Sequence, residues 1–134
     1  MKFLQLFVLW ICILCWFPQA TAGEDPDFLR GCELYQHGKG DPAKYPEALQ
    51  HYMKAAERGH ARSQYYVGRM YQLEPRVGID LDLAKKWYRS AGEGGDCMAW
   101  NNLVVIYRDT NVPDPITLEC IHRALELNAD NPDV

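Results

Sequence analysis

An internal repeat constrains this chain more than any other feature of its sequence. Shifting residues 61–95 back by 36 positions aligns several identical residues, and these include the pairs Tyr35 with Tyr71, Ala48 with Ala84, Tyr52 with Tyr88, Ala55 with Ala91 and Gly59 with Gly95. A more divergent third copy follows, because Tyr107 lies 36 positions after Tyr71 and Ala124 lies 33 after Ala91. Such a period is typical of solenoids, in which one supersecondary unit stacks on the next.

The middle copy has the pattern of two helices. Val67, Gly68 and Tyr71 are three and four residues apart, so they share one helical face, and Gly68 allows another backbone to approach. The second half predicts a helix that ends at the glycines 94 and 95, with one face formed by Ala84, Trp87, Tyr88 and Ala91. One hairpin of this length cannot bury both of its faces, so the copies are needed to complete a core.

We therefore predict an all-α solenoid of three antiparallel helix hairpins, with repeats at about residues 25–60, 61–96 and 97–132. Caps and helix-breaking residues place the six helices at about 25–36, 46–59, 61–73, 80–93, 97–108 and 115–127. Asn111, Pro113 and Asp114 are expected in the last connecting loop.

Particular segments resemble a known family. In the middle copy, YYVGRMY and VGIDLDLAKKWYRSAGEGG resemble a Sel1-like repeat, which is related to the tetratricopeptide repeat. The first copy resembles it through YQHGKGD and EALQHYMKAAERG, although Gly31 and Cys32 align with Val67 and Gly68. In the third copy, WNNLVVIY and ALELNADNP are closer to the tetratricopeptide pattern. The resemblance implies protein binding rather than catalysis.

The first 22 residues have the pattern of a secretory signal peptide. Lys2 is their one charge, an apolar run extends from Phe3 to Phe17 with Gln5 as its only interruption, and Ala20 and Ala22 form a small-residue cleavage pattern. The run is shorter than the roughly 20 apolar residues of a membrane helix. We expect cleavage after Ala22, with an uncleaved anchor as the alternative, and a single domain at 23–134 that is periplasmic or secreted without membrane insertion.

Charge and residue spacing argue against several functional classes. The formal net charge of the whole chain is −4, and removing Lys2 with the signal makes it more negative, which disfavours nucleic acid as a partner. The four histidines lack metal-ligand spacing, and neither a Ser-x-x-Lys motif nor a glycine-rich phosphate loop is present. We predict no metal, no cofactor and no enzymatic activity. The histidine at position 60 is expected in a capping or solvated role.

Three cysteines remain after the predicted cleavage. Cys32 takes a small, inward position of the first helix, so we expect a buried thiol. Cys97 and Cys120 belong to opposite helices of the third hairpin, which leaves open either a disulfide or two free thiols.

Aromatic residues recur at the hairpin period and are expected in the core. Among them, Trp87 is predicted to be deeply buried, and its replacement by Ala should be more costly than the same change at Trp100. The recurring set comprises Tyr35, Tyr52, Tyr71, Trp87, Tyr88, Trp100 and Tyr107.

The resemblance to tetratricopeptide-type solenoids implies that the first helix of each hairpin lines a concave groove. Helical spacing selects the residues off the packed face as candidates for binding a partner, namely Glu33, Arg62, Tyr65, Arg69, Gln72, Asn101 and Arg108, together with Leu29, Gln36 and Val105. Three arginines in one groove suggest an acidic partner segment, since guanidinium groups bind carboxylates well. The alternative is that each arginine is solvated or pairs with a local acid. Lys39 is expected in a loop far from the groove.

Three functions are compatible with these observations. The favoured hypothesis is an exported adaptor that binds another protein through the groove. An immunity protein that neutralises a toxin or lipase in the periplasm is the alternative that the resemblance implies. A β-lactam-interacting enzyme is the least favoured.

Overall fold

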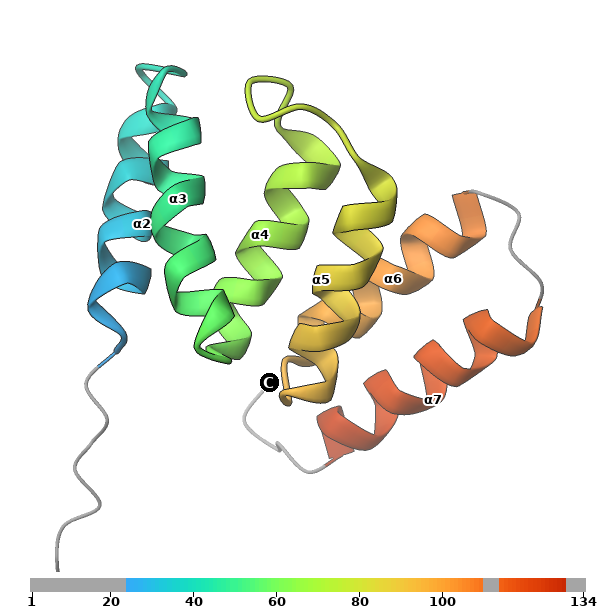
Figure 1. Cartoon of the computed structure of the whole chain (residues 1–134). Coiled ribbons are helices and arrows are strands. Elements are labelled where there is room, and N and C mark those ends of the chain that lie inside the picture. The colour runs from blue at the N-terminus through green and yellow to red at the C-terminus, as the bar shows by residue number, and fades with distance from the viewer. Residues whose placement is uncertain (1–23, 110–113, 130–134) are drawn as a thin grey trace, which may run out of the picture.

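The computed structural model describes residues 24–109 and 114–129, and the chain is helical throughout those ranges except for short connections (Figure 1). The helices are α2 Pro26–Gly38, α3 Lys44–Glu57, α4 Ala61–Leu73, α5 Leu81–Glu93, α6 Cys97–Asp109 and α7 Asp114–Ala129. Each packs on the next, so α2–α3, α4–α5 and α6–α7 form three stacked hairpins. The predicted all-α solenoid is confirmed. The predicted signal peptide at 1–22 lies outside the described residues.

Side-chain caps fix where most helices begin. The carboxylates of Asp25, Asp80 and Asp96 accept hydrogen bonds from backbone N–H groups in the first turns of α2, α5 and α6. At α4 the cap is His60, whose Nδ1 accepts from the Ser63 backbone N–H at 3.2 Å, which confirms the capping role. Two helix starts were predicted one or two residues late: α3 begins at Lys44, and α7 begins at Asp114, which was expected in the loop.

Close approach between the two helices of a hairpin depends on a glycine. A β-carbon added to Gly31 in α2 would lie 2.6 Å from Cδ1 of Tyr52 in α3, and one added to Gly68 in α4 would lie 2.9 Å from Cδ1 of Tyr88 in α5. Gly31, and not Cys32, is therefore the structural equivalent of Gly68. Gly31 and Gly68 are 37 residues apart, whereas their contacts Tyr52 and Tyr88 are 36 apart. The 36-residue shift therefore aligned Cys32 with the buried Gly68 by mistake, and Cys32 is partly exposed instead of buried.

The core consists of two apolar clusters. The first joins α2 and α3 to α4 around Leu34, Tyr52, Val67 and Met70. The second joins α4 and α5 to α6 and α7 around Tyr88, Trp100, Leu103 and Cys120. Tyr66 and Tyr71 pack against both clusters and so connect the first repeat to the second.

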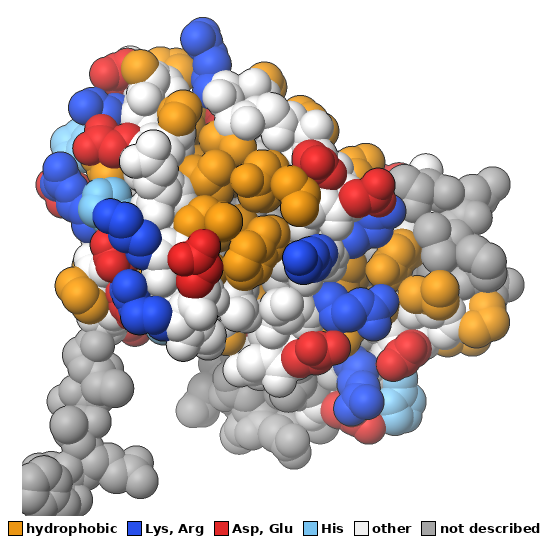
Figure 2. Space-filling model, viewed as in Figure 1, with side chains coloured by type: hydrophobic (Ala, Val, Ile, Leu, Met, Phe, Trp, Pro, Cys, Tyr) orange, Lys and Arg blue, Asp and Glu red, His pale blue; other side chains and the backbone are white. Residues whose placement is uncertain are grey.

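The two tryptophans of the predicted core differ in burial. Trp100 is 4% exposed and its ring covers Gly92, whereas Trp87 is only partly buried at the edge of the first cluster. The expectation that Trp87 is deeply buried was wrong. Figure 2 shows hydrophobic side chains gathered on the surface where α3 faces the α4–α5 hairpin. Partly buried residues of the first cluster include Leu49, Met53, Val77 and Trp87.

An ionic cluster joins the start of α2 to the end of α3. Arg58 Nη2 lies 2.7 Å from Asp25 Oδ1 and 2.8 Å from Asp27 Oδ2, and His51 Nδ1 lies 2.9 Å from Asp27 Oδ1. The Arg58 hydrogen bond lowers the pKa of Asp25 below its usual value. The His51 hydrogen bond, followed by that of Arg58, lowers the pKa of Asp27 in the same way.

The described residues contain neither a membrane-spanning helix nor a cluster of metal ligands. No helix within 24–109 or 114–129 has the length and apolar character to cross a membrane. In the same ranges, no three His, Cys, Asp or Glu side chains come together in a way that could hold a metal ion.

Candidate functional site

The first helices of the hairpins, α2, α4 and α6, present a shared set of exposed or partly exposed side chains, which we call the first-helix surface. Its members are Leu29, Glu33, Gln36, Arg62, Arg69, Gln72, Asn101, Val105 and Arg108. All were predicted from helical spacing. Tyr65 was predicted with them, but it is 8% exposed and its ring centroid lies 5.8 Å from that of Tyr88. The reason is that α4 packs against both α3 and α5, so its apolar face is wider than one stripe.

The three arginines of this surface have different surroundings. Arg62 Nε lies 3.3 Å from Oδ2 of the buried Asp96, and Arg108 Nε lies 3.5 Å from Oδ1 of its neighbour Asp109. Arg69 forms no ion pair with any carboxylate of the described residues, and its guanidinium carbon lies 5.9 Å from the centroid of the Tyr35 ring. Two of the three arginines thus have local acidic partners, which was the alternative expected from the sequence, and the cradle of three arginines stays a prediction.

Other predicted residues also have partners within the chain. Glu33 accepts a hydrogen bond from Arg30 at 2.6 Å, and the side-chain oxygen of Gln72 accepts one from the Tyr88 hydroxyl at 2.7 Å. Gln72 thus helps to fix the position of a core ring. Asn101 is exposed on α6.

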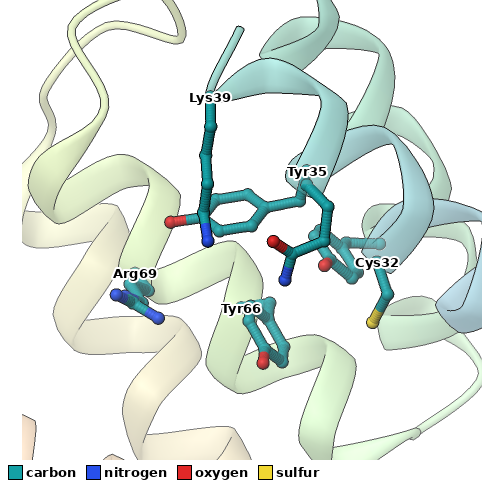
Figure 3. Close-up of a pocket in the computed structure, with 7 residues that line it drawn as sticks. Cys32, Tyr35, Lys39, Tyr66 and Arg69 are labelled. Carbon is teal, nitrogen blue, oxygen red and sulfur yellow. The ribbon is translucent and has the colours of Figure 1, made fainter.

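A hollow of about 160 Å³ lies between α2 and α4, and we call it the α2–α4 pocket (Figure 3). Helix α2 and its end contribute one wall, α4 contributes the other, and α3 contributes one residue. The lining residues are Cys32, Tyr35, Gln36, Lys39, Tyr52, Tyr66 and Arg69.

Two cations approach this pocket from different elements. Figure 3 shows the Lys39 side chain descending from the end of α2 beside Tyr35, while Arg69 comes from α4. No acidic residue lines the pocket, and Lys39, like Arg69, forms no ion pair within the described residues. The expectation that Lys39 lies far from the groove was wrong. It followed from ending the first helix at Gln36, whereas α2 continues to Gly38.

One of the lining residues, Tyr52, has an unsatisfied hydroxyl group. Tyr52 is fully buried, and its hydroxyl oxygen has no hydrogen-bond partner among the described residues. Burial, and after it the neighbouring Cys32 side chain, raises the pKa of Tyr52 far above its usual value. Burial likewise raises the pKa of Tyr66, although the Arg62 and Arg69 charges oppose the shift. The phenol of Tyr52 therefore stays protonated and remains a hydrogen-bond donor.

The sequence contained a signal for the pocket. Cys32, Tyr35, Gln36 and Lys39 are spaced by three and four residues, so they share one face if the helix is extended by a turn. Tyr52 could not be recognised in this way. Its repeat partner Tyr88 occupies the same position of the pattern, yet the hydroxyl of Tyr88 is hydrogen-bonded, so the pattern does not distinguish the two tyrosines.

The cysteines of the third hairpin do not form a bond in the structure. Cys97 is partly exposed and Cys120 is buried, and both are free. A disulfide between them remains a prediction.

Two comparisons connect the chain to known proteins. The family model described as Sel1 repeat matches residues 28–60 and 61–96, which together exceed half of the 134 residues. The crystal structure of c5321, a protective antigen of uropathogenic Escherichia coli strains that displays an SLR fold, is similar with a TM-score of 0.67 and 29% identity. That match covers 75% of this chain and 22% of c5321, so the chain spans less than a quarter of that protein. Sel1 repeats are usually non-catalytic scaffolds for protein–protein interaction. This chain belongs to the Sel1 repeat family.

Proposed function

We propose that this chain is an exported, non-catalytic module that binds a partner protein through the first-helix surface, with the α2–α4 pocket inside the contact. The observation that carries the proposal is the pair of cations at this pocket, Lys39 and Arg69, neither of which has a carboxylate partner in the described part of the chain. A charge left unpaired beside a hollow is available to a ligand, whereas Arg62 is already held by Asp96.

The composition of this region supports a protein partner. Tyr35, Tyr66 and Arg69 lie together there, and tyrosine and arginine are the residue types that contribute most strongly to protein interfaces. The rings of Tyr35 and Tyr66 have centroids 6.1 Å apart in an edge-to-face arrangement, so they form a fixed apolar wall.

Export is part of the proposal and rests on the signal-peptide pattern of residues 1–22. N-terminal sequencing of the protein recovered from its producing cells should give Gly23 as the first residue. Recovery of the intact chain in the cytoplasm would contradict export.

Capture of the partner from cell-envelope extracts tests the binding surface. The first double variant combines Arg69→Glu, which reverses a charge on α4, with Asn101→Glu, which adds a negative charge on α6. The control combines Lys86→Glu on α5 with Gln50→Glu on α3, both exposed positions, and makes the same total change in charge. We expect the first pair to abolish capture and the second to preserve it. The opposite pattern would overturn the proposal. The activity of the captured protein then distinguishes an adaptor from an inhibitor of a toxic effector.

A further inference from the structure

We infer that the α2–α4 pocket binds a carboxylate group, with Arg69 and Lys39 as its charged partners and the Tyr52 hydroxyl as a buried donor. The inference deepens the proposed function by naming the chemistry that the partner presents, and its biological meaning rests on that function. The carboxylate can come from an Asp or Glu side chain or from a chain terminus.

The charges at the pocket favour an anion. Lys39 and Arg69 both line it, no Asp or Glu does, and neither cation forms an ion pair within residues 24–109 and 114–129. A negatively charged group that enters the pocket therefore meets two cations and no competing carboxylate. Since the pocket is partly enclosed by Tyr35 and Tyr66, the attraction is screened less than on open surface.

The position of Arg69 favours a planar anion. Its guanidinium carbon lies 5.9 Å from the Tyr35 ring centroid, an arrangement that holds the group against an aromatic face. A guanidinium group over a ring keeps N–H donors for a ligand, and these donors match the two oxygens of a carboxylate. The Gln36 side-chain amide in the same lining provides a neutral hydrogen-bonding group.

The Tyr52 hydroxyl is the second, independent observation. This residue is fully buried, it lines the pocket, and its hydroxyl has no hydrogen-bond partner among the described residues. Buried hydroxyl groups without partners are rare in folded proteins because leaving water without a replacement bond is unfavourable. A carboxylate oxygen placed against Tyr52 would accept this O–H, and a volume of about 160 Å³ is large enough for a carboxylate and a short side chain.

Short peptides test the inference on the purified protein. Acetyl-Ala-Glu-Ala-amide presents a side-chain carboxylate and acetyl-Ala-Ala presents a terminal one. Acetyl-Ala-Gln-Ala-amide and acetyl-Ala-Ala-amide are their uncharged counterparts, and inorganic phosphate is the competing anion. Binding is followed by NMR titration of the backbone amides of α2 and α4. We expect saturable binding in the millimolar range for at least one carboxylate peptide and at least about tenfold weaker binding for its uncharged counterpart. The preferred peptide identifies the source of the carboxylate.

Conservative substitutions then locate the site. Arg69→Gln should weaken binding about tenfold and Lys39→Gln about threefold, because each removes a positive charge. Tyr52→Phe should weaken binding about threefold, because it removes one O–H donor and keeps the ring. The matched controls are Arg76→Gln in the α4–α5 connection and Lys86→Gln on α5. Both side chains are exposed, and neither lines the pocket. Circular dichroism of every variant checks that it is folded.

Several results would overturn the inference: no saturation by either carboxylate peptide, equal binding of the uncharged peptides, tighter binding of phosphate, or unchanged affinity in both Arg69→Gln and Tyr52→Phe.

The proposed function fails separately. If no carboxylate peptide binds but partner capture is still lost in the Arg69→Glu with Asn101→Glu variant, the protein-binding surface stands and the carboxylate site does not. If the peptides bind and capture is unaffected, the pocket stands and the protein-binding surface does not.

Discussion

The backbone of Gly68 in α4 lies against the ring of Tyr88 in α5, so closely that a β-carbon at position 68 would be 2.9 Å from Cδ1 of that ring. Tyr88 is fully buried there, and its hydroxyl donates to Gln72 in α4 at 2.7 Å. One residue thus fills the space that glycine leaves and forms a hydrogen bond with the opposite helix. The middle hairpin depends on this contact for its spacing.

Replacing Gly68 by Ala should therefore destabilise the protein by about 1 to 3 kcal/mol, because the added methyl group overpacks a buried ring. This cost opposes the gain of about 1 kcal/mol that Ala ordinarily brings to a helix interior. Urea unfolding followed by circular dichroism measures the difference. Gly40→Ala is the control, because a β-carbon there would lie 3.8 Å from the nearest atom, the His37 carbonyl oxygen. A more stable Gly68→Ala variant would show that α4 and α5 are farther apart.

The two tryptophans should differ in their contribution to stability. Trp100→Ala removes a ring that is 4% exposed and covers Gly92, and we expect a cost of about 3 to 5 kcal/mol. Trp87→Ala should cost less, because that ring is partly exposed at the edge of the first cluster. The free energies of unfolding of the two variants provide the test. A larger loss at Trp87 would support the order expected from the repeat pattern and contradict the packing described above.

The ionic cluster of the first hairpin should lose its contribution in acid. Asp25 and Asp27 have pKa values below their usual value of 3.8, because Arg58 and His51 stabilise the carboxylate forms. A carboxyl group with a lowered pKa in the folded state stabilises the fold above its unfolded pKa, and this stabilisation is lost as pH falls through the folded pKa.

We therefore expect the stability difference between the wild type and Arg58→Gln to be present at about pH 5 and to shrink below about pH 3.8. Thermal unfolding of both proteins across this range measures it. A difference that stays constant down to about pH 3 would mean that Arg58 contributes through packing instead of charge.

Thiol reactivity should distinguish the three cysteines of the described residues. Cys120 is buried, and its burial raises the pKa of the thiol above the usual value, so less of the reactive thiolate is present at neutral pH. In the reduced protein, iodoacetamide should modify Cys32 and Cys97, which are partly exposed, before Cys120. Peptide mass spectrometry gives the order. Modification of Cys120 at the same rate as the others would indicate that α7 opens from α6.

Local sequence patterns were sufficient to predict the fold, and the site shows where they fail. The repeat period predicted the three hairpins. Helices α5 and α6 begin after Asp80 and Asp96, whose side chains cap them. Tyr65 was misplaced because spacing along one helix does not show how many neighbours that helix has. Lys39 was misplaced because the last turn of α2 has no strong sequence signal, since it contains Gly38 and precedes Gly40. The pocket joins residues from three helices, so only packing brings them together.

Site-specific photo-crosslinking in the producing cells shows whether a partner protein binds the first-helix surface. A photoreactive amino acid is placed at Glu33 or Asn101 on α2 and α6, and at Gln50 or Lys86 on α3 and α5, all of which are exposed. We expect a crosslinked partner of one mass from positions 33 and 101 and none from positions 50 and 86. Crosslinks from positions 50 and 86 alone would rule out binding at the first-helix surface and would assign it to the second helices of the hairpins.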